Sequence, residues 1–355
     1  MILQSLRLNH FRNLADVKLE LHPRCNVFVA GNGHGKTSIL EAIYLLSRGQ
    51  SFRTHITAPL IQFECFSLAI KAVTEGEDIL QVEKNVKGLT KIHHNEKRCQ
   101  RLSDLTHMLP CQIFHQDLFQ IIDSSSQIRR RLLDWGVFYA YPEYGKLFQD
   151  FKRVLLQRNS LLKQKGSTQS LQIWNDTFVE ISKKITTYRL QYLERLITVF
   201  NDYVGKIADL NCQMSYFNGW DKHQQQSLSE VLLAQEAYDR KMMFTHSGPH
   251  HADLLFLTTH GKGKLEWSRG QQKMILIMLK LAQATLLERP CMFLLDDFMA
   301  ELDKAHIQDV YQQLKVTHGQ LFLTALDDSA KNEPFFADSR WFYLSHGQLN
   351  QVIEL

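Results

Sequence analysis

The sequence lacks the closely spaced cysteine pairs that form disulfides in small secreted proteins or that bind metal ions. Its 355 residues contain six cysteines, and no two of them stand in a C-x-x-C spacing. A chain of this length can bury a sizeable core without disulfides, so we interpret the cysteines as reduced thiols in a cytoplasm. The adjacent histidine pairs, His93 with His94 and His250 with His251, lack the i, i+4 spacing of a helical metal site. We expect no metal at either pair.

Long apolar runs are missing as well. The sequence holds no stretch of eighteen apolar residues, so we expect no membrane-spanning helix. Residues 1–7 lack the layout of a signal peptide. Hydrophobic content of 44% and charged content of 22% are ordinary for a globular protein. The net charge of +4 is compatible with a polyanionic partner and is only weak support for one.

The clearest pattern is a glycine-rich loop between an expected strand at 27–29 and an expected amphipathic helix at 38–46. Such a loop lets successive backbone N–H groups and the helix N-terminus face phosphate oxygens, as in P-loop nucleotidases. In that pattern Lys36 reaches the β- and γ-phosphates and the Thr37 hydroxyl binds Mg²⁺. The first glycine of the pattern is replaced by Ala30. Taken alone, the loop is therefore also consistent with a glycine-rich surface turn.

Apolar periodicity predicts strands and helices on both sides of this loop. Strands are expected over 2–8 and 16–21, antiparallel strands between 66 and 100, further strands over 109–114, 254–257, 291–295 and 320–325, and a closing hairpin over 341–353. Helices are expected after the capping residues 123–126, over 147–162, for roughly 25 residues over 174–199, and over 229–243 and 274–287. Residues 166–168 are predicted to join two long antiparallel helices.

The first part of this helical region is basic. Residues 129–165 hold nine Lys and Arg and three Asp and Glu. Nine minus three gives a net charge of +6, which exceeds the +4 of the whole chain. A charged run is usually a solvated helix face, and the alternative is a surface for the phosphates of DNA. Our candidates for DNA contacts are Arg129, Arg130, Lys152 and Arg153.

Three further signals follow the phosphate loop in a fixed order. Gln112 is expected just after a strand, Ser-x-Gly-Gln at 268–271 opens a helix whose N-terminus suits an anion, and an apolar strand ends in Asp296 and Asp297. Paired carboxylates at the end of a buried strand need a cation or a proton to relieve their repulsion. The order and spacing resemble the ATP-binding-cassette class of P-loop ATPases. We therefore predict an α/β protein, an ATPase head with mixed sheets and an inserted α-helical lobe, with head segments at 1–118 and 241–355 and the lobe at 119–240.

Eight blocks of sequence make the resemblance more specific. Together they resemble the RecF family of bacterial replication and repair proteins, and the resemblance covers nearly the whole chain. The Arg-Arg-x-x-Leu-Asp-Trp-Gly and Gly-Pro-His blocks are specific to that family. The blocks lie at 10–14, 31–43, 51–53, 129–136, 157–159, 247–250, 268–271 and 296–303.

This resemblance implies a function. RecF-like proteins bind ATP and single-stranded and gapped duplex DNA, form a homodimer with ATP at the interface, and hydrolyse ATP slowly, as a DNA-dependent switch. They act with RecR and RecO to help load RecA in recombinational repair and at replication forks. The resemblance implies ATP and Mg²⁺ as cofactors. It also implies that the protein is located in the cytoplasm and has no membrane partner.

The resemblance also implies roles for individual residues. Thr37 and Asp296 hold Mg²⁺, Asp297 orients or activates water, and Lys36 and Gln112 assist catalysis. Arg12 touches the nucleotide, and Asp303 lies at the dimer seam. The phosphates are held by Ala30, Gly31, Asn32, Gly33, His34, Gly35, Lys36, Thr37 and Ser38, and Ser268, Gly270 and Gln271 reach the partner's γ-phosphate across the dimer.

The sequence departs from the usual patterns at a few positions. Trp267 precedes Ser268 at a position where leucine is usual. His251 and Ala252 interrupt a stretch that is usually more polar. Many transporter ATPases carry histidine after the last core strand, where this chain has Thr324, and that loss is consistent with slow turnover. Two alternatives stay open: the ATPase subunit of a membrane transporter, and a DNA scaffold with a vestigial nucleotide site.

Overall fold

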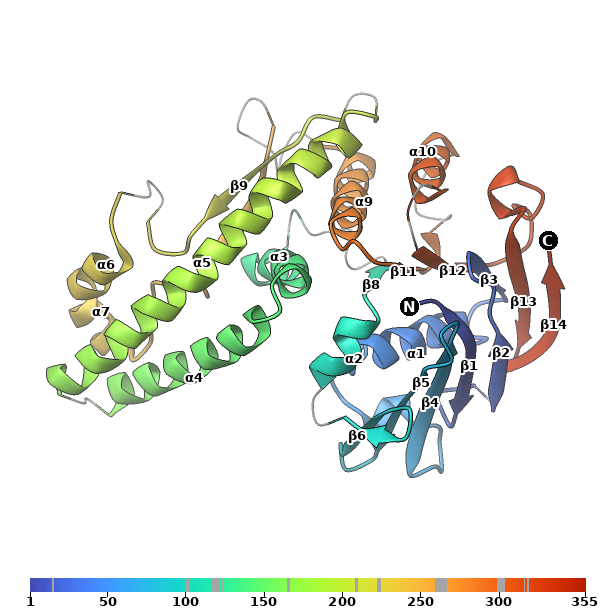
Figure 1. Ribbon diagram of the computed structural model, residues 1–355, viewed down its shortest axis with the longest axis horizontal. Helices are drawn as coiled ribbons and strands as arrows, with labels where there is room; N and C mark the ends of the chain where they lie inside the picture. Colours follow the sequence, from blue (N-terminus) through green and yellow to red (C-terminus); the bar gives the residue numbers. More distant parts are fainter. Residues whose placement is uncertain are drawn as a thin grey trace. The chain divides into compact units, whose positions relative to one another are not determined.

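The computed structural model describes residues 1–14, 16–99, 102–115, 122, 124–164, 167–207, 210–221, 225–258, 267–298, 304–315, 317 and 319–355. The chain divides into two compact units (Figure 1). We call Met1–Phe119 with Glu288–Leu355 the head unit, and Gln120–Leu287 the helical unit. Among the described residues, no helix is both long and apolar enough to cross a bilayer.

The second boundary differs from the one expected at residue 240. The compact helical unit extends to Leu287, so the described residues 241–258 and 267–287 belong to it. The reason is the helix α9 (Arg269–Thr285), which buries twelve of its seventeen residues. Two of its polar side chains bond inside the helical unit: Thr285 with Tyr203 at 2.9 Å, and Gln283 Nε2 with the Leu132 carbonyl at 2.8 Å.

One sheet of the head unit is antiparallel. Alternating burial along β4, inward at every second residue, is typical of a strand with one covered face. The expected strands over 2–8 and 16–21, which pair with each other, and the expected antiparallel strands between 66 and 100 are confirmed. The strands are β1 (Leu3–Asn9), β2 (Val17–Glu20), β4 (Ser67–Thr74), β5 (Ile79–Asn85), β6 (Thr90–His94) and β7 (Lys97–Arg98), in the order β2-β1-β4-β5-β6-β7.

The other sheet of the head unit is parallel except at one edge. Its strands β3 and β11 are buried at every position, because parallel strands are covered on both faces. The order is β14-β13-β3-β12-β11-β8, with only β14 antiparallel to its neighbour. The bounds are β3 (Cys25–Val29), β8 (Cys111–Phe114), β11 (Cys291–Leu295), β12 (Gly319–Ala325), β13 (Ser339–Ser345) and β14 (Gln348–Glu354).

Helix α1 (Lys36–Arg48) joins the two sheets into one core. It contacts β4 and β5 of the antiparallel sheet and β8 and β12 of the parallel sheet (Figure 1). Ser47, inside the helix, donates to the Leu109 carbonyl at 2.6 Å. The end of α1 is thereby tied to the segment that precedes β8, and its length packs against both sheets. The remaining short elements of the head unit are α2 (Leu102–Met108), α10 (Lys304–Lys315) and the 3₁₀ turns Ala58–Leu60 and Pro334–Phe336.

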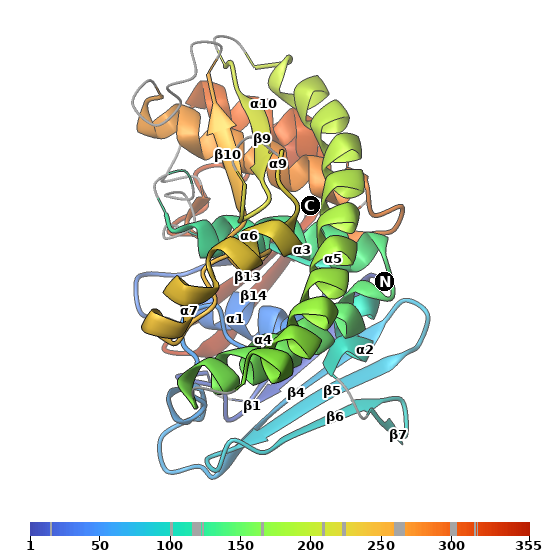
Figure 2. The same cartoon turned by 90° about the vertical axis from the view of Figure 1, so that its left-hand side faces the viewer.

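The helical unit is built on two long antiparallel helices, α4 (Tyr144–Lys163) and α5 (Thr168–Val204) (Figure 2). The expected pair is confirmed, and α5 is longer than predicted because Ser167 caps it well before residue 174. The prediction of a single helix over 229–243 is wrong. This segment forms two helices, because Gln235 has ψ 2° and leaves the helical conformation. The other elements are α3 (Ser126–Ala140), α6 (Leu228–Ala234), α7 (Glu236–Met242) and the antiparallel strands β9 (Gln213–Phe217) and β10 (Asp253–Leu257).

The family-specific block at 129–136 is explained by contacts within the helical unit. Arg129 forms a two-pronged pair with Asp253, at 2.8 Å from both Nε and Nη2. Asp134 pairs in the same way with Arg189 at 2.8 and 2.9 Å, and Arg189 also donates to the Pro249 carbonyl at 2.8 Å. These bonds join α3 to β10, α5 and the Gly-Pro-His loop.

Gly136 ends this block because α5 passes too close for a side chain. A Cβ at Gly136 would lie 2.0 Å from the hydroxyl oxygen of Tyr192, which is buried. We predict that Gly136→Ala lowers the free energy of unfolding by about 1–3 kcal/mol, the usual cost of overpacking a core. Urea denaturation followed by circular dichroism measures the change.

Gly145→Ala is the matched control for this prediction. A Cβ at Gly145 would approach only the ring of Phe138, at 3.1 Å, and that ring can shift. We expect the control to stay near the wild-type midpoint. Equal stability of Gly136→Ala and wild type would contradict the close packing of α3 against α5.

Candidate nucleotide-binding site

The loop between β3 and α1 uses two of its glycines for backbone geometry. Gly33 and Gly35 have φ of +78° and +104°, a region that side chains disfavour. Gly35 has a second constraint, since a Cβ there would lie 2.5 Å from Leu14 Cδ2. The loop is also tied from outside, because Asn13 donates to the Gly33 carbonyl at 2.8 Å.

Ala30 fits the loop without strain. It is absent from the residues with positive φ, so its methyl group meets no backbone penalty. Its N–H donates to the Ala325 carbonyl at 3.2 Å, which continues the pairing of β3 with β12. The replacement of the first glycine therefore does not disturb the loop.

Lys36 folds back over the loop as a buried cation. Its ammonium donates to the carbonyls of Ala30 at 2.6 Å and Gly31 at 3.1 Å. Burial lowers the pKa of Lys36, while the carboxylates of Asp297 and Asp296 oppose that shift. A cation held in this way is placed to pair with an anion in the loop.

Two carboxylates face the loop from the end of β11. The Thr37 hydroxyl donates to Asp296 Oδ1 at 2.9 Å, and the Thr324 hydroxyl lies 3.0 Å from the same oxygen. The N–H of Asp297 donates to Thr324 Oγ1 at 2.7 Å, and Asp297 has a left-handed φ of +47°. Burial raises the pKa of Asp296. A cation at this point would stabilise its ionised form.

Thr37 and Asp296 suit a magnesium ion. Mg²⁺ takes six oxygen ligands at about 2.1 Å, so adjacent ligands are about 3.0 Å apart. The two oxygens, Thr37 Oγ1 and Asp296 Oδ1, are 2.9 Å apart. The spacing and the chemistry of this oxygen pair fit the ion.

A cleft of about 620 Å³ lies over the loop. One wall is apolar, formed by Pro59, Ile61 and the ring of Phe63, which is 87% exposed. Asp297 also lines the cleft. Of the predicted binding residues, the cleft is lined by Arg12, Gly31, Asn32, Gly33, Gly35, Lys36, Thr37 and Ser38.

Arg12 is held at the cleft by a residue that the sequence analysis missed. Its guanidinium makes two bonds to Glu41, at 2.8 and 2.7 Å, and Glu41 is fully buried in α1. Arg53 lies 3.8 Å from the same carboxylate and also lines the cleft. The sequence did offer a signal for Glu41, because it is an acidic residue about one turn into the expected helix. The blocks at 10–14 and 51–53 each supply an arginine that can pair with it.

His34 and Ser38 are placed differently from the other loop residues. The ring of His34 lies against His346, with centroids 4.7 Å apart, and its Nδ1 accepts from the His346 N–H at 3.0 Å. It ties the loop to the turn between β13 and β14. Ser38 donates to Asn13 Oδ1 at 3.1 Å, so Asn13 bridges the loop and the helix.

Gln112 lies within β8, opposite Phe293 and two residues before the strand ends. The strand expected over 109–114 is confirmed, and the expectation that Gln112 comes just after a strand is wrong. Its neighbours Cys111 and Ile113 face the core that includes α1, so Gln112 faces the other side of the sheet. It is buried, and this position does not support a link between metal and water.

Residues 268–271, predicted to reach the partner's γ-phosphate, lie in the helical unit at the exposed start of α9. Ser268 caps the helix, with its hydroxyl accepting from the Gln271 N–H at 3.2 Å while Gln271 Oε1 accepts from the Ser268 N–H at 2.9 Å. Gly270 follows in the first turn. Trp267 is buried and donates to the Asn211 carbonyl at 3.0 Å, so it anchors the start of the helix. Asp303 lies outside the described residues.

Two of the four candidate DNA contacts are engaged inside the helical unit. Arg129 is buried in its pair with Asp253, and Arg130 donates to the Ala252 carbonyl at 2.6 Å. Burial lowers the pKa of Arg130. Their assignment to DNA is therefore corrected. Lys152 and Arg153, on α4, are exposed.

Comparisons with known proteins agree on one family. The model of the RecF/RecN/SMC N terminal domain matches residues 2–334. A DNA replication and repair protein RecF of Marinomonas sp. (strain MWYL1) is 34% identical over 99% of this chain and 98% of its own. Its counterpart in Psychromonas ingrahamii is 32% identical over 98% of this chain and 99% of its own.

Solved structures show the same likeness in three dimensions. The recombination mediator protein RecF with ATP, in the RecFOR pathway, is similar with a TM-score of 0.87 and 25% identity over 98% of both chains. An Smc head domain from Pyrococcus furiosus shares the fold, with a TM-score of 0.57 and 16% identity over 100% of this chain and 96% of its own. The expected α/β ATPase-head architecture is confirmed. The chain belongs to the RecF family of DNA replication and repair proteins.

Proposed function

We propose that this protein is an ATP-dependent DNA-binding switch of recombinational repair. It binds ATP with Mg²⁺ in the head unit, forms a dimer around the nucleotide, and contacts single-stranded and gapped duplex DNA through the helical unit. It works in the cytoplasm with RecO and RecR, since its solved relatives are described in the RecFOR pathway, and it helps to load RecA. Hydrolysis is slow and DNA-dependent.

The observation that carries this proposal is the meeting of Lys36, Thr37 and Asp296 at one end of the parallel sheet. Lys36 and the loop N–H groups hold phosphates, and Thr37 with Asp296 holds Mg²⁺. When bound, Mg²⁺ neutralises charge on the β- and γ-phosphates. Asp297, which lines the cleft, orients or activates water.

A second copy of the chain completes the site in this proposal. Ser268, Gly270 and Gln271 form the first turn of α9, where the Ser268 hydroxyl and the helix N-terminus suit an anion. In the dimer they reach the γ-phosphate held by the partner, with Asp303 at the seam. ATP therefore acts as the ligand that links two copies.

Lys36→Arg tests whether the loop works as a nucleotide site. Arginine keeps the charge but replaces a compact ammonium by a planar fork. We expect ATP affinity within about tenfold of wild type, since charge is retained, and loss of DNA-stimulated phosphate release. Calorimetric titration and a phosphate-release assay measure the two effects.

Lys36→Ala and Lys18→Arg complete that test. We expect Lys36→Ala to lose ATP binding, while Lys18→Arg, at an exposed surface ion pair, stays like wild type. Equal ATP affinity in wild type and Lys36→Ala would favour the vestigial-site alternative.

Asp296→Asn tests the metal role. The amide keeps the size of the side chain but removes the anionic ligand. The gain in ATP affinity on adding Mg²⁺ is expected to fall at least about tenfold, since even outer partners of a metal site cost 10–100-fold. Titration of ATP with and without Mg²⁺ measures it.

Thr324→Val is the matched variant for the metal test. It removes the hydroxyl that bonds to both carboxylates but leaves their charges in place. We expect a smaller loss of the Mg²⁺ effect than in Asp296→Asn. An unchanged Mg²⁺ effect in Asp296→Asn would remove Asp296 from the metal site.

The DNA surface is tested by reversing exposed charges on α4. In Lys152→Glu with Arg153→Glu we expect weaker DNA binding and a shallower salt dependence. The slope of log affinity against log salt should flatten by about 0.7–0.9 for each lost phosphate contact. Fluorescence anisotropy over a salt series measures the slope.

Lys18→Glu serves as the charge control, because it alters the net charge at an exposed residue of the head unit and leaves α4 unchanged. We expect it to leave the slope nearly unchanged. The same slope in the α4 variant and in wild type would place DNA on another surface.

A further inference from the structure

The helical unit contains a cavity that the proposed nucleotide site does not use. It has a volume of about 500 Å³ and lies between α6–α7, the end of β9 and the loop at 246–251. Its walls are mostly aromatic. Among the residues that line it are Phe217, Trp220, Gln235, Tyr238, His246 and His251.

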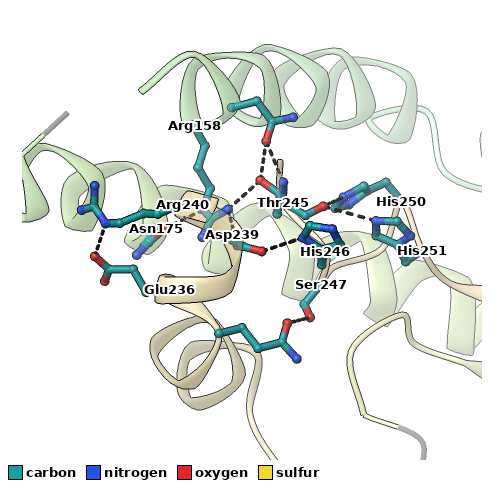
Figure 3. A network of polar contacts seen from close by, with 12 residues as sticks. Arg158, Asn175, Glu236, Asp239, Arg240, Thr245, His246, Ser247, His250 and His251 are labelled. Carbon is teal, nitrogen blue, oxygen red and sulfur yellow. Dashed lines mark hydrogen bonds and ion pairs between the residues drawn. The ribbon is translucent and has the colours of Figure 1, made fainter. Parts of the chain in front are cut away.

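A buried polar network fixes one wall of this cavity (Figure 3). Arg158, which is fully buried, donates to Thr245 Oγ1 at 2.6 Å and to Asn175 Oδ1 at 2.8 Å. It also pairs with the buried Asp239 at 2.9 Å. The Asn159 side chain accepts from the Thr245 N–H at 2.9 Å. The block at 157–159 thereby holds the loop that carries Thr245.

The same network orients the histidines around the cavity. His246 Nδ1 lies 3.0 Å from Asp239 Oδ1, so the buried carboxylate holds one edge of that ring (Figure 3). The Nε2 atoms of His250 and His251 lie 3.0 and 3.2 Å from the Thr245 carbonyl. Burial lowers the pKa of His250 to about 3 and also lowers that of His251. Because a carbonyl oxygen can only accept, both rings donate from Nε2.

The result is an aromatic surface whose rings contact one another and which is open to solvent. Tyr238 is 51% exposed and its ring centroid lies 4.6 Å from that of His246. Phe244, also exposed, lies 5.8 Å from His251. Rings held in place from behind can stack on a flat ligand without losing much side-chain freedom.

The edges of this cavity are polar. Gln235 Oε1 accepts from the Ser247 hydroxyl at 2.7 Å, which leaves the amide nitrogen of Gln235 to face a ligand. Neither that nitrogen nor Trp220 Nε1 has a partner within the part of the chain that the structure describes. A purely apolar occupant would bury such groups unpaired, at about 1–3 kcal/mol each. A heteroaromatic ring with hydrogen-bonding edges would satisfy them.

One exposed cation lies beside the cavity, although residues 218–251 as a whole hold four Asp and Glu against three Lys and Arg. Lys241 is exposed and three residues after Tyr238 in α7, so it lies on the same helix face. A cation one turn from an exposed aromatic ring suits a phosphate attached to a stacked base.

We propose that this cavity receives an unpaired nucleobase of single-stranded DNA, stacked on Tyr238 and held at its edge by Gln235 and Trp220. Lys241 pairs with the neighbouring phosphate. The inference rests on the proposed DNA-binding function and adds a site for bases to a surface for phosphates. It also gives the Gly-Pro-His loop a role, since His250 and His251 support the wall.

The test compares two strands of equal length, a labelled thymidine oligonucleotide and an abasic sugar–phosphate strand. For Tyr238→Ala we expect affinity for the thymidine strand to fall about 5- to 150-fold, the range for one lost stacking contact. Affinity for the abasic strand and the salt slope should stay at wild-type values, because the phosphate contacts remain. Fluorescence anisotropy measures both.

Two variants control for folding and for surface effects. Tyr238→Phe keeps the ring and should bind like wild type, and Leu233→Ala removes an exposed side chain of α6 that does not line the cavity. ATP binding should be unchanged in every variant. Equal binding of the thymidine strand by Tyr238→Ala and Leu233→Ala would overturn the inference, as would an equal loss for the abasic strand.

The outcomes separate this inference from the proposed function. If the wild-type protein bound neither strand, DNA binding itself would be refuted. If Tyr238→Ala kept strand binding but lost retention on immobilised RecO or RecR, the cavity would be a protein-docking site and the inference would fail.

Discussion

The parallel register of β3, β12 and β11 is the constraint on which the nucleotide site depends. Leu323 in β12 lies opposite both Val27 in β3 and Leu295 in β11. The carboxyl ends of the three strands therefore meet at one edge, where the phosphate loop and Asp296 leave the sheet. A slip of one residue in any of these pairs would move every side chain of that strand to the other face of the sheet. Backbone pairing of the three strands thus sets the positions of the residues that bind metal and phosphate in the proposed function.

Buried charge around that edge is balanced locally. Lys36 is held by loop carbonyls, Asp296 by two hydroxyls, and Arg12 by Glu41. Each group is satisfied before any ligand arrives, because an unpaired buried charge would cost several kcal/mol. The same arrangement leaves the loop N–H groups of the glycine-rich segment as the donors for phosphate. The site is therefore ready for an anion without a large rearrangement of side chains.

The helical unit uses buried ion pairs in place of a regular sheet. Arg129 with Asp253, Arg189 with Asp134 and Arg158 with Asp239 join segments that are far apart in sequence. Pairs of this kind add little net stability, but breaking one leaves a buried charge behind. We infer that they specify one packing of the long helices. The family-specific blocks are in this view chiefly structural, which explains why two of their arginines are not available to DNA.

The sequence by itself determined the local elements and the chemistry of the loop. Strands, the helix after the loop and the Asp296–Asp297 pair follow from periodicity and composition, because these depend on neighbours in the chain. Tertiary structure alone decided the rest. Gln112 faces away from α1, Arg129 and Arg130 turn inward, and Glu41 anchors Arg12, because each position depends on partners distant in sequence. The boundary at Leu287 has the same cause, since α9 buries its apolar side chains inside the helical unit.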